Sequence, residues 1–157
     1  MSTGFDFITT TDKPALLALT NIDWLESAKS ALQELGFKVH TASNHSEFIT
    51  SFHQIAYQVV IIEESFAANR PEENQSLIAL QNMPMSLRRH AVILLVGDAF
   101  STFNPMQAFQ LSVHAVVNRS EMFLLLQLLQ KLVADNELFL QSFRAVQQRL
   151  TEGKSAA

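Results

Sequence analysis

The chain has 157 residues, of which 48% are hydrophobic and 17% are charged, and this composition is typical of one globular domain with a short appended segment. The formal net charge is −4 and no basic stripe is present, which argues against direct binding of nucleic acid. Without cysteine, the sequence can form no disulfide and no thiolate metal site. We expect neither a secretory signal nor a membrane span, so a cytoplasmic protein is the simplest interpretation.

Short apolar runs alternate with amphipathic segments along most of the chain. Residues 1–13 are polar and rich in threonine, and we interpret them as a flexible N-terminal tail. Continuous or alternating apolar runs are typical of strands that are buried in a sheet. The expected strands cover residues 14–20, 37–41, 57–62, 91–96 and 113–117.

The first two expected helices have recognisable start signals. Asp23 followed by Glu26 resembles a capping box, and Gly36 is a plausible stop for that helix. Asn44 with Glu47 predicts the start of the second helix in the same way.

Prolines mark the later helices. Pro71 suits the first turn of a helix over about residues 72–82, which Pro84 ends. Pro105 begins a short helix through Phe109. Strands that alternate with helices in this way predict a doubly wound α/β fold, in which helices cover both faces of a five-stranded parallel sheet.

The carboxyl ends of the strands are where open α/β sheets carry their chemistry. Polar or charged residues follow four of the expected strands. They are Thr20 and Asn21, Glu63 and Glu64, Asp98 after Val96 and Gly97, and Asn118 with Arg119.

Three strings carry a family resemblance: YQVVIIEE at residues 57–64, AVILLVGD at 91–98 and VHAVVNRS at 113–120. In this order and spacing, residues 14–134 resemble the receiver domains of bacterial response regulators, which have a flavodoxin-like fold. The resemblance implies an acidic pair after the first strand that holds Mg²⁺ and an acceptor aspartate after the third strand. It also implies a hydroxyl after the fourth strand, a lysine after the fifth, and an aromatic switch residue three positions before that lysine.

None of the matching positions in this chain carries the family's residue. The matched site residues are Thr20, Asn21, Glu63, Val96 and Arg119, and the matched switch position is Val116. Without the acidic pair, the site lacks the charged oxygen ligands that Mg²⁺ needs, and phosphoryl transfer depends on such a metal. We therefore expect a pseudo-receiver with no cofactor, no metal and no catalytic activity.

Two interpretations of Glu63 remain open. It could pair with Arg119 and mimic the phosphorylated state permanently, or it could be a carboxylate that faces water at the end of a strand. A metal held by Glu63 together with Glu64, Asp23 and Asp98 is disfavoured, because Asp23 is better explained as a helix cap and Asp98 as a loop residue.

The C-terminal segment has a helical pattern from Ser120 to about Thr151 without glycine or proline, which is longer than one covering helix needs. Its apolar residues follow a heptad pattern, in which Asn136 at an a position could fix the register of a parallel dimer. We expect a homodimer through a coiled coil formed by Leu129, Leu132, Asn136, Phe139, Phe143, Val146 and Leu150. We accordingly divide the chain into a receiver-like domain over residues 14–134 and a C-terminal helical extension over residues 135–157. The alternative is that 120–134 is the last domain helix and that 136–151 is a separate helix covering the globule, with a break at Asp135–Asn136.

Two further groups of residues are candidate surfaces. The fourth helix and the fifth strand form the output surface of receiver domains, and the matching surface here contains Phe103, Met106 and Phe109. We expect an unidentified protein partner there. The basic group Arg88–Arg89–His90 is interpreted as a solvated edge.

The resulting functional hypothesis is a phosphorylation-independent protein–protein interaction module in bacterial signal transduction. One alternative is a sensor that binds a small anion at the degenerate site through Arg119 and loop amides. The other is a receiver that is still phosphorylated, with Asp23 or Asp98 assisting.

Overall fold

The computed structural model describes residues 7–156, with side chains through Gly153. Of the expected flexible tail, residues 1–6 lie outside this part. Residues 9–12 form a turn in which the Asp12 carboxylate accepts a hydrogen bond of 2.8 Å from the backbone nitrogen of Thr9. This bond is the main reason that the pKa of Asp12 is lowered. The Lys38 ammonium group lies 3.8 Å from the Asp12 carboxylate, so the turn is held against the second strand.

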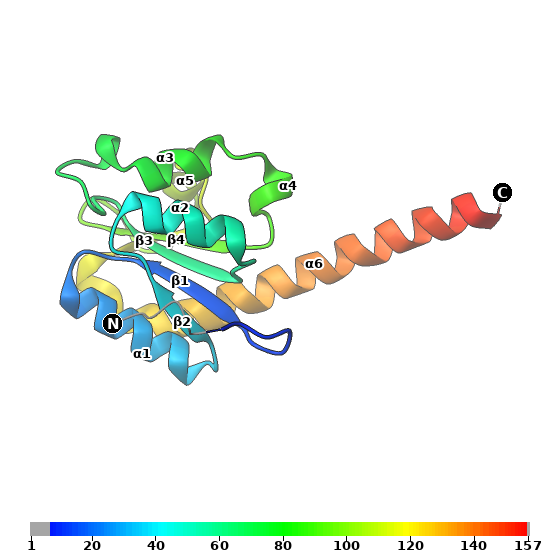
Figure 1. Cartoon of the computed structure of the whole chain (residues 1–157), viewed down its shortest axis with the longest axis horizontal. Coiled ribbons are helices and arrows are strands. Elements are labelled where there is room, and N and C mark those ends of the chain that lie inside the picture. Colours follow the sequence, from blue (N-terminus) through cyan, green and yellow to red (C-terminus); the bar gives the residue numbers. More distant parts are fainter. Residues whose placement is uncertain (1–6, 157) are drawn as a thin grey trace.

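A single parallel sheet with the strand order β2-β1-β3-β4-β5 forms the centre of the molecule, which confirms the expected fold class (Figure 1). Each strand lies within one of the expected apolar runs or overlaps it. The strands are β1 (Pro14–Ala18), β2 (Lys38–Thr41), β3 (Val59–Glu63), β4 (Val92–Gly97) and β5 (Ala115–Asn118).

The sheet register brings the candidate site residues to one edge. Ala18 pairs with Ile62, Glu63 with Val96 and Gly97 with Asn118. The ends of β1, β3, β4 and β5 therefore lie next to one another, as the carboxyl ends of parallel strands must.

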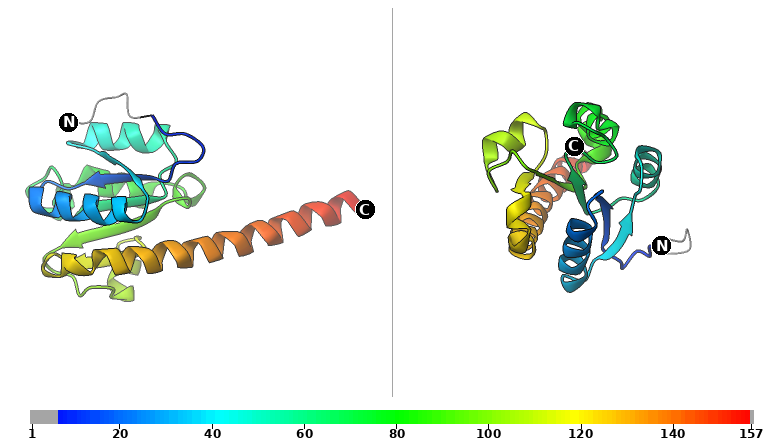
Figure 2. Two further views of the ribbon diagram at one scale, coloured as in Figure 1. Left: turned by 90° about the horizontal axis from the view of Figure 1, so that it is seen from below. Right: turned by 90° about the vertical axis from the view of Figure 1, so that its left-hand side faces the viewer.

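Helices cover both faces of the sheet. Figures 1 and 2 show α1 and α6 on one face and α2, α3 and α5 on the other. The helical segments are α1 (Ile22–Glu34), α2 (His45–Gln54), η1 (Pro71–Glu73), α3 (Gln75–Asn82), α4 (Met85–Arg88), α5 (Pro105–Gln110), η2 (Arg119–Leu124) and α6 (Leu125–Ala156). Pro71 begins the short 3₁₀ turn η1 rather than the α-helix that was expected from residue 72.

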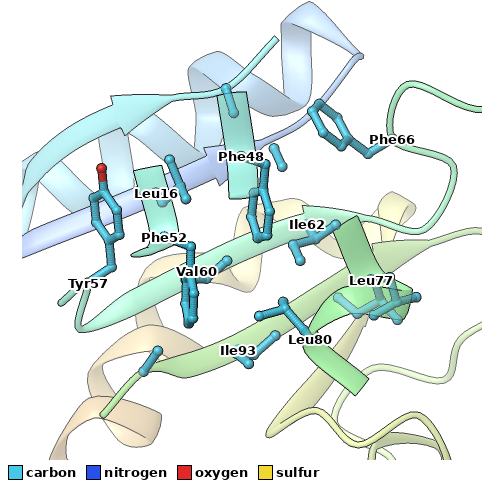
Figure 3. Close-up of a cluster of buried hydrophobic side chains, with 14 of the residues drawn as sticks. Leu16, Phe48, Phe52, Tyr57, Val60, Ile62, Phe66, Leu77, Leu80 and Ile93 are labelled. Carbon is cyan, nitrogen blue, oxygen red and sulfur yellow. The ribbon is translucent and has the colours of Figure 1, made fainter. Parts of the chain in front are cut away.

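Alternate strand residues point to two separate cores, because successive side chains of a strand face opposite sides of the sheet. Leu16, Val60 and Ile93 contribute to the core beneath α2 and α3 (Figure 3). Rings from the helices and loops complete this core, and they are Phe48, Phe52, Tyr57 and Phe66. The neighbouring strand residues Leu17 and Ile61 pack against α1 and α6 in the second core. Strands buried on both faces explain why the sequence has continuous apolar runs.

Asparagine caps the start of five helical segments. The capping residues are Asn21, Asn44, Asn74, Asn104 and Asn118, and each side-chain oxygen accepts a hydrogen bond from a backbone nitrogen in the first turn. The expected Asn44 cap is confirmed, and the Glu47 carboxylate accepts a 3.0 Å hydrogen bond from the backbone nitrogen of Ser43. The expected Asp23 cap is wrong, because Asn21 holds that position and Asp23 lies in the first turn of α1.

The C-terminal helix α6 is continuous over 32 residues. Figures 1 and 2 show that it covers the sheet first and then projects well beyond the domain. The expected alternative of a break at Asp135–Asn136 and a second helix that packs back on the globule is therefore wrong. No helix in residues 7–156 has the combination of length and apolar character that crossing a membrane requires.

Candidate functional site

Glu63 at the end of β3 is bound by the backbone of the β1–α1 loop. Its Oε1 accepts hydrogen bonds from the backbone nitrogens of Thr20, at 2.8 Å, and Asn21, at 3.2 Å. Asn21 caps α1, so the carboxylate lies at the positive end of that helix, where free N–H groups and the helix dipole favour an anion. Glu63 therefore binds the same loop in which a metal-binding receiver carries its acidic pair.

The loop after β3 is tied to this position by Asn74, a fully buried residue. Its Nδ2 donates to the backbone oxygens of Glu63, at 3.0 Å, and Glu64, at 3.1 Å. Its Oδ1 accepts a hydrogen bond from the backbone nitrogen of Leu77 and so caps α3. Sequence reasoning missed Asn74, and the only available signal was an asparagine directly before an amphipathic helix.

Thr20 makes a second link between the loops. Its hydroxyl oxygen accepts a 3.2 Å hydrogen bond from the backbone nitrogen of Ala67, which has a positive φ of 49°. Thr20 thus binds the β3–α3 loop through its side chain and Glu63 through its backbone nitrogen. The two loops that frame the site are consequently joined by hydrogen bonds of the protein itself.

Arg119 does not pair with Glu63. Its Nε lies 2.5 Å from Oδ1 of Asp98, and both side chains are largely exposed. The Glu63–Arg119 ion pair, one of the two interpretations left open by the sequence, is therefore wrong, since each residue has a different partner. An exposed ion pair of this kind contributes about 0–1 kcal/mol to stability.

Glu64 fills the space above Gly97. A methyl group on Gly97 would lie 2.4 Å from Cδ of Glu64, which leaves room only for glycine while Glu64 stays in place. Oε1 of Glu64 accepts a 3.2 Å hydrogen bond from the backbone nitrogen of Asp98. Burial is the main cause of a raised pKa at Glu64, and the charges of Asp98, Glu63 and Glu72 raise it further.

Val96 and Val116 are both fully buried and belong to opposite cores. Val96 packs with the α1 and α6 side, so the expected hydroxyl position offers only methyl groups to the core. Val116 packs on the other side of the sheet, and its carbonyl oxygen accepts a 2.8 Å hydrogen bond from the backbone nitrogen of Phe103. A rotating aromatic ring therefore has no counterpart at residue 116.

Asn118 fixes the β4–α5 loop to the end of β5. Its Nδ2 donates to the backbone oxygens of Asp98, at 3.2 Å, and Phe100, at 2.8 Å. Its backbone nitrogen donates to the Thr102 hydroxyl oxygen at 2.9 Å, and that hydroxyl donates to Glu121 at 2.6 Å. A chain of hydrogen bonds therefore holds this loop against the end of β5. Sequence reasoning did not identify Thr102 or the role of Asn118.

Metal binding finds no support in the arrangement of the carboxylates. Within the part of the chain that the structure describes, no three His, Cys, Asp or Glu residues are grouped so that they could hold a metal ion. Glu63, Glu64, Asp23 and Asp98 therefore do not form such a group.

Solved structures with the same arrangement include several receiver domains. A CheY-like response regulator receiver domain protein from Methanospirillum hungatei JF-1 is 16% identical, with a TM-score of 0.62 over 81% of this chain and 98% of that chain. The chemotaxis response regulator CheY4 of Vibrio cholerae is 19% identical, with a TM-score of 0.59 over 78% of this chain and 99% of that chain. NtrX from Brucella abortus is 10% identical, with a TM-score of 0.65 over 86% of this chain but only 29% of that chain.

This chain has the receiver fold. No protein-family model matches its sequence, and no curated protein is similar to it in sequence. At these low identities the likeness shows the fold of the receiver-like domain and not its chemistry.

On the receiver-like domain, the expected partner surface is exposed. Met106 and Phe109 project from α5, and Phe103 precedes it with a positive φ of 65°.

The expected dimer residues divide into two groups. Leu129 is fully buried in the core of its own domain, so its assignment to a dimer contact is wrong, and Leu132 is partly buried against the same core. The residues beyond them are exposed or partly exposed, and they are Asn136, Phe139, Phe143, Val146 and Leu150.

Proposed function

We propose that this protein is a phosphorylation-independent pseudo-receiver that acts by binding other proteins in a signal transduction system. The observation that supports this most directly is the pair of hydrogen bonds from Thr20 and Asn21 to Glu63. Glu63 is at the position of the family's acceptor residue. Its two donors belong to the loop in which the family has its metal ligands. A fixed carboxylate at a helix N-terminus is a structural anion, and it needs no cation for its stabilisation.

The chemistry of phosphoryl transfer supports the same conclusion. Transfer depends on positioning and on neutralising the charge that develops, usually with Mg²⁺. Thr20 and Asn21 supply no carboxylate, Val96 supplies no hydroxyl, and Arg119 is paired with Asp98. This pairing also weakens the alternative of a small-anion sensor that uses Arg119. We propose that the domain has no catalytic activity of its own.

The test is incubation with acetyl phosphate and Mg²⁺, followed by measurement of the intact mass. We expect no added phosphoryl group, while a receiver domain with the full set of acidic residues gains one under the same conditions. Uptake by wild type that is lost in Glu63→Gln would contradict the proposal. Uptake that is lost in Asp98→Asn would support the alternative of a receiver with shifted site residues.

The proposed partners are proteins, including a second copy of this chain. The projecting half of α6 carries exposed apolar residues with heptad spacing, which favours a parallel coiled-coil homodimer. Asn136 would lie at an a position and set the register of the two helices. Phe103, Met106 and Phe109 form the second proposed contact, on and beside α5. We propose neither a nucleic-acid nor a membrane partner, and we propose that the protein acts in the cytoplasm.

A further inference from the structure

Arg88 in α4 is buried without a counter-charge. It was expected on a solvated edge, yet it is only 5% exposed. Its Nη1 donates a 2.7 Å hydrogen bond to the backbone oxygen of Leu80, and Nη2 donates to the backbone oxygen of Ser112. Its Nε has no hydrogen-bond partner. Among the described residues, no carboxylate lies within 4.0 Å of this guanidinium group.

A buried cation of this kind is unusual, because removing a charge from water is costly unless an opposite charge offsets the loss. Burial accordingly lowers the pKa of Arg88. An arginine side chain has five N–H donors, and two of them are used in the bonds to Leu80 and Ser112. Donor capacity for an anion therefore remains.

Arg88 lines an open groove of about 450 Å³ between the end of α3, α4 and the start of β5. The apolar walls of the groove include Met83, Met85 and Val113, and Phe109 stands at its rim with 80% of its surface exposed. No aspartate or glutamate lines it. This local charge is opposite to the net charge of −4 of the whole chain.

His114 also lines the groove. Its Nδ1 accepts a 3.0 Å hydrogen bond from the backbone nitrogen of Ile93, so the proton of the neutral ring is on Nε2. Burial and the charge of Arg88 lower the pKa of His114, which keeps the ring neutral at physiological pH. The groove thus combines one cation, one neutral imidazole and apolar walls.

A second hollow shares Met85 and His114 with the groove and leads to Phe139 on α6. The one acid that lines it, Asp135, already binds Lys131 at 3.1 Å. The groove and the second hollow together therefore carry the positive charge of Arg88, and they contain no carboxylate that lacks a partner.

We propose that this groove binds a short segment of a partner protein in which a carboxylate side chain lies next to an apolar side chain. The carboxylate supplies the missing counter-charge to Arg88, and the apolar side chain covers Phe109 and the methionines. The inference rests on the proposed protein-binding function and names the chemistry of one contact. It concerns the opposite end of the sheet from Glu63.

The test uses 3-phenylpropionate as the probe and 3-phenylpropionamide as its neutral match, with NMR spectroscopy of the full-length protein. A ligand of this size is expected to bind with a Kd of about 1–10 mM. We expect the carboxylate to shift the Nε–H signal of Arg88 and the backbone amides of Val113 and His114. The amide should leave these signals unchanged. Arg88 is not substituted, because its bonds to Leu80 and Ser112 join two parts of the fold.

The variant Phe109→Ser tests the apolar contact of the groove, and Phe123→Ser is its control. Both rings are exposed, at 80% and 77%, but Phe123 is on η2 at the α1 and α6 face. We expect Phe109→Ser to weaken binding of the probe about tenfold, since the ring loses its apolar contact. Phe123→Ser should have no effect.

Three results would overturn the inference. They are equal binding of the amide, shifts that map away from Arg88, and unchanged affinity in Phe109→Ser. Groove signals that shift with protein concentration alone would identify a second copy of this chain as the occupant instead. None of these outcomes bears on the acetyl phosphate experiment, so failure of this inference and failure of the proposed function can be distinguished.

Discussion

The Oε1 atom of Glu63 lies 2.8 Å from the backbone nitrogen of Thr20, which joins the end of β3 to the loop after β1. The same oxygen is 3.2 Å from the backbone nitrogen of Asn21. Without this carboxylate, two backbone donors before α1 would have to find water instead. The position that the family uses for chemistry is therefore part of the packing of this protein.

Glu63→Ala should lower the free energy of unfolding by about 1–3 kcal/mol, because hydrogen bonds to a charged acceptor are lost. Glu63→Gln retains an acceptor oxygen and should cost about half as much. Urea denaturation measures both changes, and the exposed Glu26→Gln serves as the control that changes charge alone. A Glu63→Ala protein as stable as wild type would show that the two hydrogen bonds contribute nothing.

Asn74→Ala should cost about 2–4 kcal/mol, since it removes the cap of α3 and leaves two carbonyl oxygens near β3 without their donor. Thermal denaturation should show a clear decrease in Tm. Asn104→Ala, which removes only a helix cap, is the matched control and should cost about 1 kcal/mol. Equal effects of the two substitutions would mean that the bonds to Glu63 and Glu64 add no stability.

The stability of the protein should also depend on Glu64 in a defined direction. Because burial raises its pKa above the ordinary 4.5, the folded state retains a proton at pH values where the unfolded chain has lost it. The wild type therefore loses stability as the pH rises from 4.5 through the raised pKa, and this loss is absent below that window. Glu64→Gln can still accept the hydrogen bond from Asp98 but carries no charge.

We expect the advantage of Glu64→Gln over wild type to grow as the pH increases through this window, and urea denaturation over a pH series measures it. Glu26→Gln should show no such trend. A difference between Glu64→Gln and wild type that does not change with pH would contradict the assignment.

The strands were predictable because runs such as residues 57–62 and 91–96 must be buried on both faces, and only a covered parallel sheet provides such positions. The start of α1 was misassigned because Asp23 and Asn21 are both good capping residues, and the choice between them depends on the path of the β1–α1 loop. The ion-pair partner of Arg119 could not be predicted for a similar reason. The pairing of Arg119 with Asp98 depends on loop geometry, which no spacing in the sequence encodes.

The heptad pattern also had two physical causes that the sequence could not separate. A residue with a/d spacing is equally compatible with a sheet beneath the helix and with a second helix beside it. Leu129 is covered by the sheet, whereas Phe139 has the same spacing but is 67% exposed. Arg88 is a comparable case, because burial of an arginine depends on which carbonyl groups the fold brings to it.

The projecting half of α6 provides the last prediction. Phe139→Glu with Val146→Glu places charges at two adjacent d positions, so it should convert a dimer into a monomer. Leu138→Glu is the matched control, because Leu138 is 64% exposed and Phe139 is 67% exposed, but Leu138 lies outside the seam. Analytical ultracentrifugation of the full-length chain measures the molar mass. A wild-type protein that is monomeric at all concentrations, or a dimer that Leu138→Glu disrupts as strongly, would contradict a dimer built on this seam. Asn136→Leu tests the register separately, since removing the buried polar pair should permit assemblies larger than a dimer while raising thermal stability.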